Sequence, residues 1–164
     1  MNGPSSTSRH LRTPVAVLLC AHVVAGFIGG AETAYAAPPS AATIITTISF
    51  AALWIGLSLW AGLRAVPRFT WFAALAWIIV ILVIALGMLA TASDGVVPGY
   101  QLLLFLYFLA EPPLYGLTPV VPTGDSHLAT MVLAGVLGLL CIAVNLLARR
   151  HARRTPDITE PDTP

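Results

Sequence analysis

Residues 69–92 read FTWFAALAWIIVILVIALGMLATA, an apolar run without a single charged side chain. A helix over such a run covers roughly the 30 Å hydrocarbon core of a bilayer, because each residue adds about 1.5 Å. Three further runs, at 14–33, 41–63 and 127–148, have a similar length and character. The sequence therefore predicts an all-α integral membrane protein with a bundle of four transmembrane helices.

The composition of the whole chain points the same way. Of 164 residues, 57% are hydrophobic and 9% are charged, whereas a soluble domain is about 25% charged. So few charges cannot cover the surface of a soluble globule, and this argues against a soluble enzyme, a disordered chain and a nucleic-acid-binding protein. The expected partner is the lipid bilayer.

Residues 100–121, YQLLLFLYFLAEPPLYGLTPVV, are harder to assign. The first half is apolar, but Glu111, Pro112 and Pro113 interrupt the run. A carboxylate at the bilayer centre and prolines inside a helix are both costly. Hydropathy alone does not decide whether this segment crosses the membrane.

The positions of the arginines indicate whether residues 100–121 cross the membrane. The chain has no lysine, and its eight basic residues are Arg9, Arg12, Arg64, Arg68, Arg149, Arg150, Arg153 and Arg154. With four spans, all eight lie on one side of the membrane, whereas a fifth span divides them four to four. Because positive residues favour the cytoplasmic side, we predict four spans, both termini in the cytoplasm, and a re-entrant or interfacial helix at 100–121 on the outer face.

Four spans divide the chain into a cytoplasmic arm at 1–13, which we expect to be disordered, a membrane domain at 14–148 and a cytoplasmic tail at 149–164. A lysine-free chain rich in Ala, Leu and Arg suits a bacterial cytoplasmic membrane protein. One alternative stays open, because Ala34-Tyr35-Ala36 has the small-x-small form of a signal-peptidase site. Cleavage after Ala36 would leave three spans.

Glu111, His22 and Glu32 are the candidate residues for an ion or substrate path. A carboxylate at a Pro-Pro break resembles the interrupted helices of transporters. The favoured alternative is that the break turns a flat helix back to the interface and leaves Glu111 in water. His22 is the one ionisable residue deep in a span, where a neutral, hydrogen-bonded imidazole is the more common role.

Asp125 and His127 are candidate metal ligands, since they lie close together among acids expected on the outer face. The spacing matches no metal-binding motif, and Asp125 or Ser126 is equally suited to cap the last helix. We therefore expect no cofactor. Glu32, Asp94 and Glu111 complete the outer acids.

Small residues four apart let helices approach closely, within the chain or between chains. The glycines in such patterns are Gly26, Gly30, Gly56, Gly62 and Gly138. They predict helix packing and are compatible with self-association.

No catalytic motif is recognisable in the chain. The leading prediction is a non-enzymatic accessory or interaction subunit of a membrane complex. The alternatives are a small transporter or channel that uses Glu111, His22 and the outer acids, and a metal-dependent membrane enzyme at Asp125 and His127.

Overall fold

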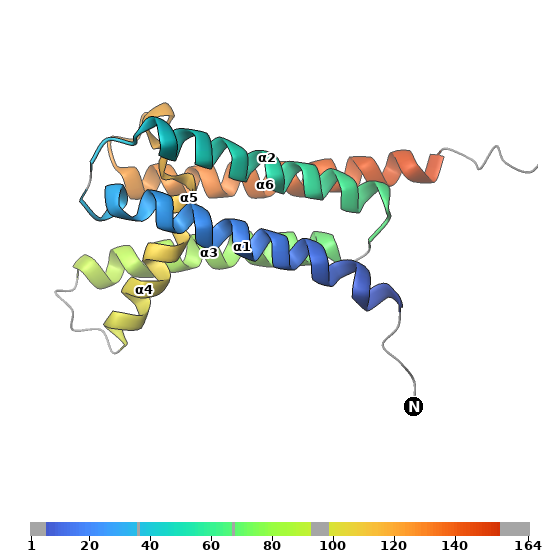
Figure 1. The fold of residues 1–164 in the computed structure, drawn as a ribbon, viewed down its shortest axis with the longest axis horizontal. Coiled ribbons are helices and arrows are strands. Elements are labelled where there is room, and N and C mark those ends of the chain that lie inside the picture. The colour runs from blue at the N-terminus through green and yellow to red at the C-terminus, as the bar shows by residue number, and fades with distance from the viewer. Residues whose placement is uncertain (1–5, 36, 67, 93–98, 155–164) are drawn as a thin grey trace, which may run out of the picture.

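The computed structural model describes residues 6–35, 37–66, 68–92 and 99–154, and these form helices and turns without a strand among them (Figure 1). The elements are α1 (Ser6–Ala34), α2 (Ala41–Leu63), α3 (Phe69–Ala92), α4 (Tyr100–Ala110), α5 (Pro112–Tyr115), the 3-10 turn η1 (Thr118–Val120) and α6 (Ser126–Arg154). Among the described residues, α1, α2, α3 and α6 are long and apolar enough to cross a membrane. The prediction of four such helices is confirmed, and α2 and α3 have the bounds expected from the sequence.

Two helices are longer than predicted. Helix α1 begins at Ser6, so much of the arm expected to be disordered is helical, and α6 continues past residue 148 to Arg154. Extending an existing helix adds one hydrogen bond per residue without a new nucleation cost. Arginines in the last turn of α6 also interact favourably with its carbonyl end. Ala36 and Asp94 lie outside the described residues.

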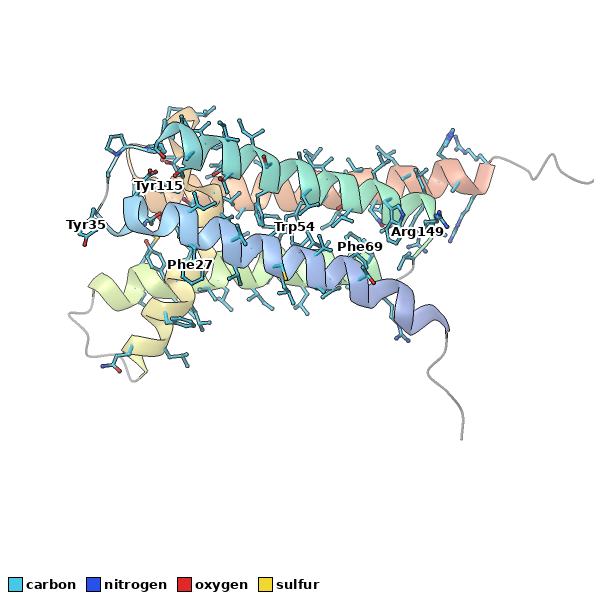
Figure 2. All side chains as sticks on the ribbon, viewed as in Figure 1. Phe27, Tyr35, Trp54, Phe69, Tyr115 and Arg149 are labelled. Carbon is cyan, nitrogen blue, oxygen red and sulfur yellow. The ribbon has the colours of Figure 1, made fainter. Side chains whose placement is uncertain are left out.

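The two ends of the bundle differ in charge. Figure 1 shows the start of α1, the α2–α3 turn and the end of α6 at one end, which we call the arginine end because these segments carry all eight arginines. Figure 2 marks this end by Arg149 and the opposite end by Tyr35 and Tyr115. Glu32, Glu111 and Asp125 belong to segments at the opposite end, the acidic end.

Helix α6 packs against both α2 and α3, and α1 packs against α2. Trp54 and Trp77 are buried in the middle of the bundle, with ring centroids 5.0 Å apart. Asn145 on α6 joins the three helices: the Thr70 hydroxyl donates to its Oδ1 at 2.6 Å, and its Nδ2 donates to the Ser58 carbonyl at 2.9 Å. A polar contact of this kind fixes helix register in an apolar bundle.

Two of the five predicted packing glycines lie at close helix contacts. A Cβ on Gly62 would lie 2.6 Å from the Ala148 Cβ, and one on Gly138 would lie 2.9 Å from the Trp77 Cβ. Gly26 is buried in α1. Gly30 and Gly56 face open space.

The chain breaks its helix at Glu111, between α4 and α5. Pro112 and Pro113 cannot donate a backbone hydrogen bond, so the helical pattern cannot continue through them. Glu111 keeps a helical conformation, and its N–H still bonds to the Tyr107 carbonyl. The predicted position of the break is therefore correct.

Glycines let α4 and α5 lie against the long helices. A Cβ on Gly29 of α1 would lie 2.8 Å from the Pro112 carbonyl oxygen, and one on Gly87 of α3 would meet the Tyr107 ring. Gly116 lies against α2, where its N–H donates to the Thr47 hydroxyl at 3.2 Å. These contacts bury α5 instead of leaving it on the surface.

Candidate functional site

Glu111 is the central residue of the candidate site. Its exposed fraction is 0%, so the expectation that it lies in water is wrong. The physical reason is the packing of α5, since the contact between Gly29 and Pro112 brings the break beneath α1. A flat helix on the surface would have kept the carboxylate solvated.

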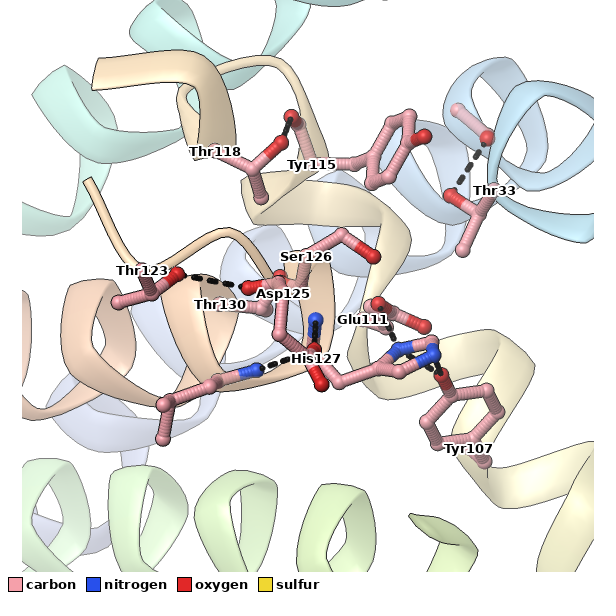
Figure 3. A network of polar contacts seen from close by, with 12 residues as sticks. Thr33, Tyr107, Glu111, Tyr115, Thr118, Thr123, Asp125, Ser126, His127 and Thr130 are labelled. Carbon is pink, nitrogen blue, oxygen red and sulfur yellow. Dashed lines mark hydrogen bonds and ion pairs between the residues drawn. The ribbon is translucent and has the colours of Figure 1, made fainter. Parts of the chain in front are cut away.

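His127, in the first turn of α6, is the partner of Glu111. Its Nδ1 lies 2.7 Å from Glu111 Oε1, and its side chain is 40% exposed. The pair therefore connects a buried carboxylate to the surface through one imidazole. Figure 3 shows the two side chains pointing toward each other from α6 and from the break.

Tyr107 completes the cluster. It lies four residues before Glu111, so the two side chains project from the same face of the chain. Its hydroxyl forms a hydrogen bond with His127 Nδ1 (Figure 3). Burial, and then the hydrogen bond with Glu111, raise the pKa of the Tyr107 hydroxyl above its ordinary value. The phenol therefore stays protonated and can donate a hydrogen bond.

The cluster is suited to holding a proton. A buried ionised carboxylate is costly unless it is paired, and His127 is the partner that contacts Glu111. The second carboxylate oxygen, Oε2, is also buried and has no hydrogen-bond partner among the described residues. Acid and imidazole side chains in contact are groups that relay protons in membrane proteins.

Asp125 does not join this cluster. Its Oδ1 accepts the backbone N–H groups of His127 at 2.7 Å and Leu128 at 3.1 Å, which caps α6. The hydrogen bond from Leu128 makes the largest contribution that lowers the pKa of the Asp125 carboxyl. Within the described part of the chain, no three His, Cys, Asp or Glu side chains are grouped so that they could hold a metal ion.

Glu32 and His22 make other contacts. Glu32 Oε2 accepts the Ser40 N–H at 3.0 Å across the α1–α2 loop. The His22 ring contacts Phe50 edge to face, with centroids 5.4 Å apart. The three predicted path residues therefore have separate contacts. Glu111 is paired with His127, which was predicted as a metal ligand and not as a path residue.

Tyr115 anchors the far side of the break. Its hydroxyl donates to the Ala37 carbonyl at 2.9 Å, so α5 is tied to the loop after α1. Burial, followed by the charges of Glu111 and Glu32, raises the pKa of the Tyr115 hydroxyl. Neither Tyr107 nor Tyr115 was predicted as a site residue, although the spacing of Tyr107 and Glu111 could have indicated the first.

Comparisons with protein families, with curated proteins and with solved structures found no match to this chain.

Proposed function

We propose that the chain is a multi-pass protein of a bacterial cytoplasmic membrane, with both termini in the cytoplasm. Four long apolar helices support the membrane location, and the gathering of all eight arginines at one end supports the orientation. In this placement α4, α5 and η1 form a re-entrant element at the outer face. The acidic end then faces outward.

Thiol labelling of intact cells tests the orientation. Pro122 and His151 are both exposed, at opposite ends of the bundle. A membrane-impermeant thiol reagent is expected to label a Pro122→Cys variant in intact cells and a His151→Cys variant only after permeabilisation. The wild-type chain, with Cys20 and Cys141, gives the background. Labelling of His151→Cys in intact cells would contradict the proposed topology.

Within this membrane protein, we propose that Glu111 and His127 bind and release a proton during transport of an ion or solute. The observation that carries this proposal is the contact between a fully buried carboxylate and a half-exposed imidazole at a helix break. A buried ionisable group in a membrane protein costs stability. In transporters such groups form proton relays, and ion sites lie at interrupted helices.

The geometry suggests the order of the relay. His127 meets solvent at the acidic end and exchanges protons there, while Glu111 holds the proton inside. The Tyr107 hydroxyl forms a hydrogen bond with the same imidazole nitrogen that contacts Glu111, and it holds the ring in place. The interpretation as an accessory subunit stays a prediction, which a pull-down in gentle detergent would test.

Infrared difference spectroscopy tests proton binding at Glu111. The acid-minus-base spectrum of wild-type protein in liposomes is expected to contain a protonated-carboxyl band that Glu111→Gln lacks. Glu32→Gln, at an acid of the same end whose carboxylate bonds to Ser40, is the matched control and should keep the band. In the same vesicles, an imposed membrane potential should drive proton flux that Glu111→Gln abolishes. An unchanged band and unchanged flux in Glu111→Gln would refute the proposal.

A further inference from the structure

A cleft of about 400 Å³ lies between α1 and α3. Its volume is in the range of small-molecule sites in proteins. Thirteen residues from four helices line it, and all except His22 are apolar. The floor includes Leu18, Trp54 and Trp77, which are buried.

The mouth of the cleft opens sideways, between two helices that would both face lipid. Leu19 on α1, and Leu75 and Ile79 on α3, line the cleft and are each about half exposed or more, at 60%, 59% and 49%. Leu106 and Ala110 of α4 close the end nearest the break. In Figure 1, α4 crosses the bundle obliquely at the acidic end, which agrees with this closure.

The cleft extends along the helices. Its lining on α3 runs from Phe72 to Val83, and eleven helical steps correspond to about 16 Å. This is about half of the 30 Å hydrocarbon core, the depth that the acyl chains of one leaflet fill. A slot parallel to the helices, apolar and open to lipid, therefore fits a single hydrocarbon chain.

A cationic residue lies beyond the end of the slot that Phe72 lines. Arg68 precedes α3 directly and is exposed, and the Phe72 N–H bonds to its carbonyl at 3.0 Å. Residues four apart lie on one face of a helix, so Arg68 lies one turn beyond the slot on the face that Phe72 lines. Among the described residues, no carboxylate forms an ion pair with Arg68. Arg64 in the same turn is also exposed.

We propose that the cleft binds one acyl chain of an anionic phospholipid from the leaflet at the arginine end, with the headgroup phosphate at Arg68. Basic residues beside a gap between membrane helices are a recognised arrangement for anionic headgroups. The inference rests on the proposed membrane placement, and it is independent of proton binding at Glu111.

Native mass spectrometry of the full chain tests this site. The protein is taken from nanodiscs that contain equal amounts of phosphatidylglycerol and phosphatidylcholine. Wild type is expected to retain phosphatidylglycerol about fivefold over phosphatidylcholine, and Arg68→Gln is expected to lose that preference while still retaining lipid.

Ala76→Phe fills the cleft, because Ala76 lines it, and this variant is expected to lose most of the retained lipid of both kinds. Ala143→Phe, on an exposed face of α6 outside the cleft, is the matched control and should behave as wild type. Equal retention in Ala76→Phe and Ala143→Phe would overturn the proposal. So would equal retention of the two lipids by wild type, or a second copy of the chain that Ala76→Phe alone displaces.

A measurement on the unaltered protein removes any dependence on the folding of Ala76→Phe. Phosphatidylglycerol with a photoreactive acyl chain is expected to label peptides of α1 and α3 that line the cleft, and labelling confined to other helices would overturn the proposal. Extraction of membranes at alkaline pH reports membrane insertion separately. A protein that resists extraction but retains no lipid would refute this site and leave the proposed function standing.

Discussion

Replacement of His127 by Ala is expected to lower the free energy of unfolding by about 3–5 kcal/mol, because it leaves the buried Glu111 carboxylate without its partner. Glu111 has no exposed surface, and its Oε1 lies 2.7 Å from His127 Nδ1. The hydrogen bond between Tyr107 and Glu111 is expected to remain, but a neutral phenol cannot neutralise the charge of the Glu111 carboxylate. The measurement is reversible unfolding in mixed detergent micelles.

A double-mutant cycle separates this cause from the loss of the imidazole's own contacts. Glu111→Gln removes the charge and keeps the shape, so the double variant His127→Ala/Glu111→Gln should be more stable than His127→Ala alone. His151→Ala, at an exposed histidine near the other end of α6, is the matched control and should change stability little. If His127→Ala and His151→Ala lower the free energy of unfolding equally, His127 does not stabilise the Glu111 carboxylate.

The positions of the four long helices along the chain could be predicted because each helix depends on local sequence. The run at 69–92 carries no charge, and Arg64 and Arg68 mark the turn before it, so length and composition were sufficient. The end of α6 was underestimated, because hydropathy detects where apolar residues stop and not where the helix stops. The positions of the arginines also predicted that Glu32, Glu111 and Asp125 lie at the opposite end of the bundle.

The candidate site could be predicted only in part. The break at Glu111 follows from two consecutive prolines, but its burial depends on Gly29, which lies far away in the chain and allows Pro112 to approach α1. Asp125 and His127 were grouped because they are neighbours in sequence. In the structure, the turn directs Asp125 to backbone N–H groups and His127 to Glu111, so contacts across elements decide which pair interacts.

The second large effect is expected at Gly62, where α2 and α6 are in close contact. A Cβ at this position would lie 2.6 Å from both the Ala148 Cβ and the Asn145 carbonyl oxygen. A backbone oxygen cannot rotate away, so Gly62→Ala must push the two helices apart. Overpacking of this kind costs about 1–3 kcal/mol.

The movement would also disturb Asn145, whose side chain bonds to Thr70 and to the Ser58 carbonyl. Gly62→Ala is therefore expected to lose unfolding free energy toward the upper end of that range. Gly56→Ala on the same helix meets nothing within 4 Å, and it should be neutral or gain up to about 1 kcal/mol from helix propensity. Because the two substitutions add the same methyl group to the same helix, their difference isolates the contact with α6. Equal stability of the two variants would mean that α2 and α6 do not approach at Gly62.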